Sequence, residues 1–361
     1  MQSCNVAKGQ KALEGLKALL VRSEFPTFFK LTLIRAKLIP VLLYGAELWG
    51  MQSRLCVKLQ KVLDIALRMA TQSPRNVSKG RLLAETQVAQ LAELAASRRL
   101  RGFNKFPTLN TWCSILINNP SVSKNRTWLT STKAWIKRYL KEVPNEDKKH
   151  QMTLIYATRQ DNGDKTLATA WAKSLNLNQE PPLWIRLGLT NPSLAKPLSL
   201  IGKIRLGIFP IGQRLVHAKG LGRQYLNKCP VCEEDEAESI VHLILHCKVF
   251  DEERRIFLLP VIRERKIQLT DSDRVVSALL GGEAEPVTEN VSLGAKRTKL
   301  TQLDDLKALS VIALAKYLKM IVPKRYGRIA PKLSFNTNEL HDARPKRYAS
   351  SRRAGVRKGV F

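Results

Sequence analysis

The chain has few acidic residues for its size. Its 361 residues include 30 Asp and Glu against 61 Lys and Arg, which gives a formal net charge of +31 at pH 7. A surplus of this size repels itself in a compact protein unless a polyanion neutralises it, and nucleic acid is the commonest polyanionic partner. The composition therefore predicts binding to RNA or DNA, and we expect no small-molecule substrate.

Long hydrophobic runs are also missing. The longest nearly apolar stretch, Leu38–Gly50, is shorter than the roughly 20 residues that a membrane-spanning helix needs, and it contains Glu47. The first residues, MQSCNVAKGQK, lack the apolar segment of a secretory signal. We expect no membrane partner and a nuclear or cytoplasmic location. The nucleus is favoured by basic motifs at Pro323–Arg325 and Arg344–Tyr348.

Catalytic motifs are equally scarce. The sequence has no Gly-rich phosphate loop, no Pro-Asp pair, and no recognisable Ser-His-Asp or Cys-His arrangement. Asp161 and Asp164 do not amount to the four carboxylates of a ribonuclease H site. The one Asp-Asp pair, Asp304–Asp305, falls in a predicted helix, where acids in the first turn are stabilised by the helix dipole. We expect no catalysis by this chain alone.

Helical periodicity is the main pattern that is present, and it predicts a mainly α fold. Leucines recur at three- and four-residue steps at 13–20 and again at 55–67, and Ser78 is suited to cap a helix. Pro40 should end or kink a helix near Ile39, and 281–297 reads as a linker. The clearest helix is Thr301–Val322, which Pro323 should end.

These patterns suggest five regions. One region, 200–255, surrounds a cluster of cysteine and histidine. Another, 101–199, holds most of the tryptophans, which we interpret as core anchors rather than as platforms for bases. The regions are a helical, thumb-like unit at 1–100, a Trp-containing helical connector at 101–199, a metal-binding segment at 200–255, a helical region at 256–322 and a disordered basic tail at 323–361.

Cysteine is rare, and half of the six cysteines lie close together. The spacing is Cys229-x2-Cys232-x9-His242-x4-Cys247. A Cys-x2-Cys turn places two thiolates on one side of the backbone, and His and Cys from a following short helix can complete a tetrahedron around Zn2+. His246, one helical turn from His242, competes with Cys247 for the fourth place; we prefer Cys247 because thiolate binds zinc tightly. Four protein ligands leave no open position, so the zinc is predicted to be structural.

Charge is distributed unevenly around this cluster. The loop Glu233–Glu238 is the most acidic stretch of the chain, whereas 201–228 contains no acid. We expect the zinc to fix the basic segment while the acidic loop faces away or pairs with part of it. The residues predicted to contact phosphates are Arg205, Arg214, Lys219 and Arg223 in the basic segment, and Lys324, Arg325, Lys346, Arg347, Arg352 and Arg353 in the tail.

Two segments resemble one known family. The run LGIFPIGQRLVHAKGLGRQYLNKCPVC followed by HLILHC is similar to the zinc-binding segment downstream of the reverse transcriptase in LINE-type non-long-terminal-repeat retrotransposons. The resemblance implies the ligands Cys229, Cys232, His242 and Cys247 and treats His246 as variable. IPVLLYGAELW resembles the element that follows the catalytic palm, through Tyr44, Gly45, Glu47 and Trp49.

The resemblance implies that most of 1–280 corresponds to the thumb and C-terminal region of the polymerase. The aspartates that would hold two magnesium ions in the polymerase have no counterpart in this sequence. A zinc-stabilised, non-catalytic nucleic-acid-binding fragment is therefore the leading hypothesis. The alternatives are a part of an RNA-directed DNA polymerase or endonuclease that is active only with a further N-terminal part, and a protein-interaction or non-functional truncated product.

Overall fold

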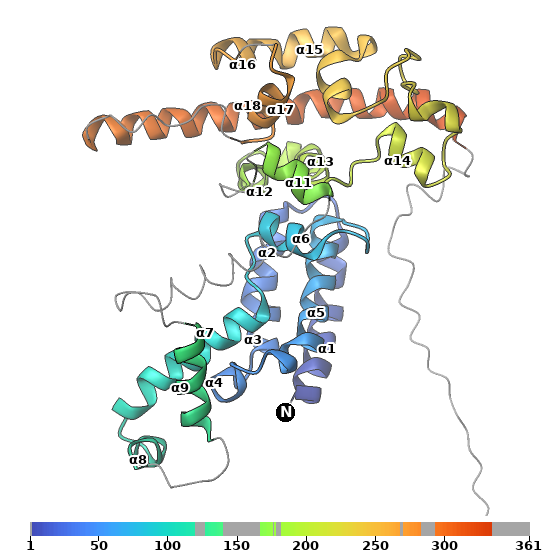
Figure 1. Ribbon diagram of the computed structural model, residues 1–361. Coiled ribbons are helices and arrows are strands. Elements are labelled where there is room, and N and C mark those ends of the chain that lie inside the picture. The colour runs from blue at the N-terminus through green and yellow to red at the C-terminus, as the bar shows by residue number, and fades with distance from the viewer. Residues whose placement is uncertain are drawn as a thin grey trace, which may run out of the picture.

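The computed structural model describes residues 2–119, 127–139, 167–175, 177, 182–267, 270–282 and 293–333. This part of the chain is mainly helical and contains no β-strand, which confirms the predicted fold class. Figure 1 shows an N-terminal group of helices beneath a layer that is crossed by one long helix. The tail residues Lys346, Arg347, Arg352 and Arg353 lie outside the described residues.

The N-terminal half consists of helices joined by short turns. Its elements are α1 (Gln2–Val21), α2 (Thr27–Leu33), the π-turn η1 (Ile34–Leu38), α3 (Ile39–Leu42), α4 (Ala46–Trp49), α5 (Ser53–Thr71), α6 (Lys79–Thr86), α7 (Leu91–Lys105), the 3-10 turn η2 (Phe106–Thr108), α8 (Trp112–Asn118) and α9 (Trp128–Tyr139).

The C-terminal half is built in the same way from shorter helices and one long one. Its elements are α11 (Leu167–Ser174), α12 (Leu183–Thr190), η3 (Pro192–Leu194), α13 (Ala195–Arg205), α14 (Gly212–His217), η4 (Arg223–Leu226), the π-turn η5 (His242–His246), η6 (Lys248–Phe250), α15 (Asp251–Phe257), α16 (Leu259–Glu264), α17 (Ser272–Leu279), α18 (Leu293–Ile329) and η7 (Ala330–Lys332).

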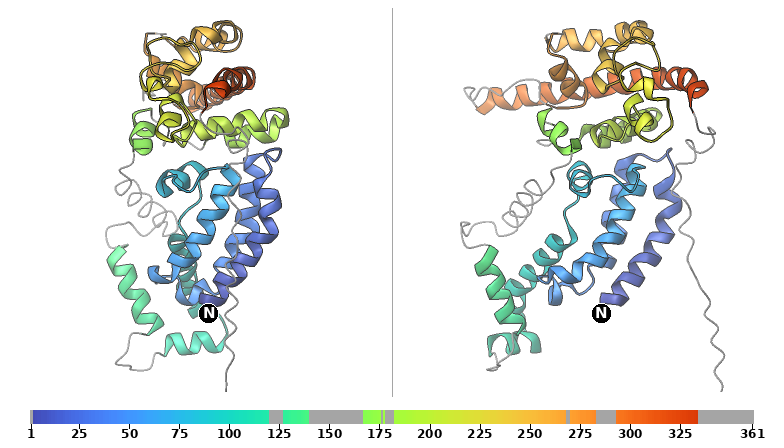
Figure 2. Two further views of the ribbon diagram at one scale, coloured as in Figure 1. Left: turned by 90° about the vertical axis from the view of Figure 1, so that its right-hand side faces the viewer. Right: turned by 45° about the vertical axis from the view of Figure 1, so that its right-hand side comes forward.

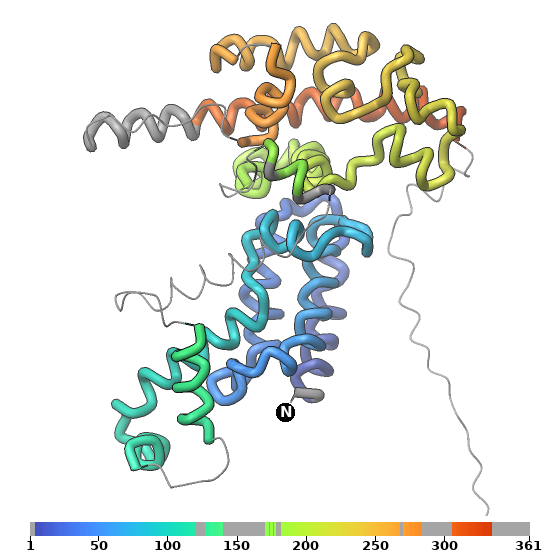
Figure 3. Tube along the Cα trace, in the orientation of Figure 1, coloured from blue at the N-terminus to red at the C-terminus, as the bar shows by residue number. Residues whose placement is uncertain are grey.

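Helices α1 and α5 pack lengthwise against each other (Figure 2). Their leucine repeats supply the contact: Leu16 and Leu20 of α1 and Leu63 and Leu67 of α5 are buried, as the three- and four-residue spacing predicts. Gly9 has a packing role, because a Cβ added there would lie 2.3 Å from a methyl group of Leu42. Helices α7, α8 and α9 extend away from this pair (Figure 3).

Two local predictions in this half have different outcomes. Ser78 caps α6 as expected, and its hydroxyl accepts a hydrogen bond from the amide of Arg81 at 3.3 Å. Pro40 does not end the helix, which continues to Leu42. The distortion instead takes the form of the π-turn η1, directly before the proline. A proline cannot donate an amide and its ring crowds the carbonyl four residues earlier, so a widened turn accommodates it.

Helix α18 forms the centre of the C-terminal layer. Helices α12 and α13 pack on it from the side of the N-terminal unit, and α15, α16 and α17 pack on it from the other side (Figure 1). Leu314, Tyr317, Leu318 and Ile321 are all buried along it. Helices α16 and α17 lie within the region 256–322 that was predicted to be helical, and a turn separates them.

The predicted ends of this helix were wrong at both termini. Helix α18 begins at Leu293, inside the predicted linker, and it passes through Pro323 to Ile329. A proline inside a helix costs about 3 kcal/mol. Contacts beyond it offset this cost, because Arg325 and Ile329 are buried against the rest of the protein. The first residues of the predicted disordered tail are therefore helical.

A buried network connects the N-terminal unit to the C-terminal layer. The carboxylate of Glu85 lies 2.5 Å from Nε of Arg205 and 2.8 Å from a guanidinium nitrogen of Arg81, and all three side chains are buried. The indole nitrogen of Trp184 donates to the same carboxylate at 2.6 Å. Trp184 is 3% exposed and so is the core anchor that was expected, whereas Trp112 is 81% exposed.

Candidate metal centre

The first two candidate ligands lie on a tight turn, Cys229–Cys232, which we call the knuckle turn. The amide of Glu233 donates to the carbonyl of Cys229 at 2.9 Å, and Glu233 itself has a left-handed φ of 64°. The amide of Val231 points at the sulfur of Cys229 at 3.4 Å. This folding places both thiols on the inner side of the turn and provides a backbone donor for a thiolate.

The other two ligands come from the π-turn η5. Its closing hydrogen bond runs from the amide of Cys247 to the carbonyl of His242 at 2.7 Å. A short α-helix had been predicted here, with His242 and His246 on one face. In the wider π-turn, Cys247 rather than His246 returns beside His242. His246 is exposed, and its Nε2 lies 3.4 Å from the hydroxyl of Ser272.

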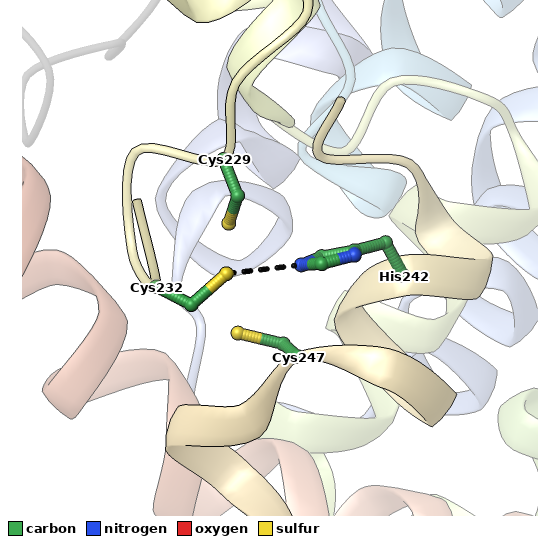
Figure 4. A group of neighbouring side chains, drawn as sticks. All are labelled: Cys229, Cys232, His242 and Cys247. Carbon is green, nitrogen blue, oxygen red and sulfur yellow. Dashed lines mark hydrogen bonds between the residues drawn. The ribbon is translucent and has the colours of Figure 1, made fainter. Parts of the chain in front are cut away.

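The four predicted ligands converge on one point (Figure 4). The donor atoms of Cys229, Cys232, His242 and Cys247 all lie within 4.8 Å of one another, so the group could hold a metal ion. Sγ of Cys232 and Nε2 of His242 are 3.4 Å apart. Cys229 and Cys247 are fully buried and His242 is 1% exposed. The choice of Cys247 over His246 agrees with this geometry.

The imidazole of His242 is oriented from behind by an acid that the sequence reading did not identify. Nδ1 of His242 lies 2.8 Å from a carboxylate oxygen of Glu236. A carboxylate at Nδ1 directs Nε2 towards the cluster, which is the usual arrangement behind a metal-bound histidine. The only sequence signal for Glu236 was its place in the acidic loop.

Within the cluster, Cys229, His242 and Cys247 shift one another's pKa values. Hydrogen bonds from the Cys247 thiol and from His242 lower the pKa of Cys229 to about 3. The pKa of His242 rises to about 10, chiefly through its hydrogen bond to Cys229 and also through Glu236, against the effect of burial. The pKa of Cys247 is raised, because its thiol donates to Cys229 and because it is buried. Binding of a metal ion would therefore have to displace protons from His242 and Cys247.

The acidic loop pairs mainly with the end of α18, not with the basic segment before the knuckle turn. Glu238 is buried and accepts from Arg325 at 2.6 and 2.8 Å, and it also accepts from the amide of Gly212 at 2.6 Å. Glu233 forms an ion pair with Lys332, which also donates to the carbonyl of Pro230.

The structure separates the predicted phosphate contacts into two groups. Arg214, Lys219 and Arg223 are exposed. Arg205 is 2% exposed and, besides Glu85, donates to the carbonyls of Leu280 and Leu177 at 2.7 and 2.9 Å. Each of its three nitrogens donates inside the protein and the side chain is buried, so Arg205 is not available to a phosphate and this prediction was wrong.

Arg325 and Lys324 are likewise engaged within the protein. Arg325 is 5% exposed and bound to Glu238, and Lys324 forms an ion pair with Glu253. Arg325 is therefore not available to a phosphate. The motif Pro323–Arg325 lies inside helix α18, where Pro323 and Lys324 are exposed and Arg325 is buried. The acids that bind these two cations lie more than 70 positions away in sequence, so composition could not indicate them.

Comparison of the chain with models of known protein families, with curated proteins and with solved structures found no match. None of the helices in the described ranges is long and apolar enough to cross a membrane.

Proposed function

We propose that this chain is a non-catalytic nucleic-acid-binding protein whose Cys/His centre holds a structural zinc ion. The resemblance to the region downstream of the palm in LINE-type reverse transcriptases supports this proposal, and so does the net charge of +31. The observation that carries it is a surface of unpaired cations on the N-terminal unit.

The donor set favours zinc. Three cysteine sulfurs and one imidazole nitrogen form a common set for structural zinc, with metal–ligand distances of about 2.0–2.3 Å. A tetrahedron of that size has edges of about 3.3–3.8 Å, and the 3.4 Å between Cys232 and His242 agrees with it. With four protein ligands, no position remains at which the ion would activate water.

The N-terminal unit carries the cations. Residues 2–105 contain eighteen Lys and Arg against six Asp and Glu. Two of these acids, Glu85 and Glu93, are buried, and Glu14 is paired with Lys17. Three of the cations, Lys30, Arg81 and Arg99, are buried as well, so fifteen Lys and Arg against four acids remain outside the core of the unit.

Helix α5 gathers these charges into one stripe. Arg54, Lys58, Lys61 and Arg68 are spaced at three-, four- and seven-residue steps and so share the face opposite the buried leucines. Arg54, Lys58 and Lys61 are exposed, and none of them has an acidic partner among the described residues. The one acid on this face, Asp64, accepts from Gln60 at 2.7 Å. Exposed cations along one helix face can contact successive phosphates of a nucleic-acid backbone.

The geometry also argues against the polymerase alternative for the chain by itself. Asp304–Asp305 lies within the long helix α18, and Asp305 is exposed there. Two-metal nucleotidyl transfer needs carboxylates from several elements that converge on one point, and a helix of this length does not provide that arrangement.

The test is a titration of a labelled 20-base-pair duplex with the zinc-loaded chain at several salt concentrations. Binding should weaken steeply with salt. Replacing Arg54, Lys58 and Lys61 together by alanine should make the slope of log K against log salt shallower by about 2–3, since each lost phosphate contact removes about 0.9. The affinity near 0.1 M salt should fall by roughly a hundredfold.

The matched control is the triple alanine variant of Lys133, Lys137 and Arg138, three exposed cations on α9. It removes the same charge from another part of the surface, and we expect a clearly smaller change in slope. Equal changes in both variants would contradict the assignment to α5, and a wild-type chain that fails to bind at 50 mM salt would overturn the proposed function.

A further inference from the structure

We infer that Tyr44 is a stacking platform for an unpaired base, so that the protein binds single-stranded nucleic acid at the turn between α3 and α4 as well as duplex on α5. This inference rests on the proposed nucleic-acid binding and adds the form of ligand that the turn would take. It is carried by an aromatic ring that is exposed although its backbone is firmly held.

Tyr44 is the most exposed large apolar side chain of the N-terminal helical unit up to α7, at 69%. Its carbonyl accepts two side-chain hydrogen bonds, one from Asn5 at 2.9 Å and one from the indole of Trp49 at 3.2 Å. The next residue, Gly45, has a left-handed φ of 69°, which a residue with a side chain rarely adopts. Two hydrogen bonds and the conformation of Gly45 therefore hold the backbone of the turn in place, and the ring of Tyr44 faces solvent.

The packing behind the turn explains why the ring of Tyr44 is not buried. The carbonyl of Glu47 accepts from the indole of Trp128 at 3.0 Å, and the stem of Glu47 packs at Gly102 of α7. The carbonyl of Leu43 accepts from Arg98 at 3.1 Å. Helices α7 and α9 therefore cover the inner side of the turn, and the one acid of α4 is held on that side.

The charge beside the ring suits a nucleic acid. The ammonium of Lys8 lies 5.9 Å from the centre of the Tyr44 ring. Lys8 is exposed, and Lys11, three residues further along α1, is exposed too. An exposed ring next to cations is the combination with which proteins hold single strands: the base stacks on the ring and the cations neutralise the phosphates.

The experiment measures the affinity of the intact zinc-loaded protein for a labelled 12-nucleotide single strand and for a duplex of the same sequence. Tyr44→Ala should weaken binding to the single strand by about five- to a hundredfold, as expected when one stacked base is lost. It should leave duplex binding unchanged, because paired bases are not offered to the ring. Tyr44→Phe keeps the ring and should behave as wild type.

An abasic strand provides the internal check. The wild-type protein should bind it about as weakly as Tyr44→Ala binds the normal strand, and the two losses should not add. Equal single-strand affinity of Tyr44→Ala and wild type would overturn this inference, while salt-sensitive duplex binding in the same experiment would leave the proposed function standing. Failure of the wild type to bind either ligand would overturn both.

Discussion

Replacing Cys229 by serine is expected to lower the zinc content of the purified protein from one ion per chain to nearly none and to unfold the segment from the knuckle turn to η6. Zinc binding in such sites contributes on the order of 10–16 kcal/mol, which is as large as the stability of many whole domains. The sulfur of Cys229 is fully buried, accepts from Val231 and lies beside the three other ligands. If the cluster holds zinc as proposed, loss of this ligand should remove the main interaction that orders the segment.

Elemental analysis and hydrogen exchange would measure this effect. His242→Ala should behave like Cys229→Ser, because its Nε2 faces the cluster. His246→Ala is the matched control: it removes a histidine from the same turn, but an exposed one that points at Ser272, so zinc content should stay at one ion. A full zinc complement in His242→Ala together with loss of zinc in His246→Ala would reverse the assignment of the ligands.

Loss of zinc should also loosen the C-terminal end of helix α18. Arg328 donates to the carbonyl of Val231 at 3.3 Å, Lys332 donates to the carbonyl of Pro230, and Arg325 is bound to Glu238. All three acceptors lie on the knuckle turn or the acidic loop. Amide exchange of 325–332 should accelerate when zinc is removed, whereas the α1–α5 pair, which makes none of these contacts, should keep its protection.

Glu85→Ala is expected to destabilise the folded protein by about 3–5 kcal/mol, the range for breaking a buried ion pair from one side. The variant would leave Arg81 and Arg205 buried without their counter-ion and would remove the acceptor of Trp184. Because this network joins the N-terminal unit to the C-terminal layer, the loss should appear in the overall urea unfolding transition. Glu14→Ala, which breaks the exposed pair with Lys17, is the control, with an expected cost below about 1 kcal/mol.

The pKa of Glu85 predicts how the stability of the folded protein changes with pH. Burial alone would raise the pKa of Glu85, but Arg205 and Arg81 outweigh burial and hold the pKa below its ordinary value. A carboxyl whose pKa is lowered by folding stabilises the protein above its ordinary pKa of about 4.5, and this contribution is lost as pH falls further. The difference in stability between wild type and Glu85→Ala should therefore be constant near neutral pH and shrink in acid. A difference that grows below pH 4 would contradict this assignment.

Local signals in the sequence were sufficient for the helical fold class and for the candidate metal ligands. Leucine spacing identified the contact faces of α1 and α5, and the Cys-x2-Cys turn with His-x4-Cys identified four side chains that do converge. Both patterns are short-range, because the residues that interact lie within a few turns or one loop of each other.

The features that could not be predicted depend on distant partners. Arg205 and Arg325 look like phosphate-binding residues in a basic sequence, yet each pairs with an acid that lies 120 or 87 residues away. Pro323 looks like the end of a helix because the tertiary contacts that carry α18 past it are not local. The wider π-turn at His242–His246 is not visible in the sequence, and helical periodicity alone would place His246 beside His242.

X-ray absorption at the zinc edge of the purified protein tests the central claim most directly, because it reads the identity and distance of the atoms bound to the ion. A closed structural centre built from Cys229, Cys232, Cys247 and His242 should give three sulfur neighbours at about 2.3 Å and one nitrogen at about 2.0 Å. A bound water oxygen in the fourth place, or a second histidine nitrogen in place of a sulfur, would contradict a closed, purely structural zinc site.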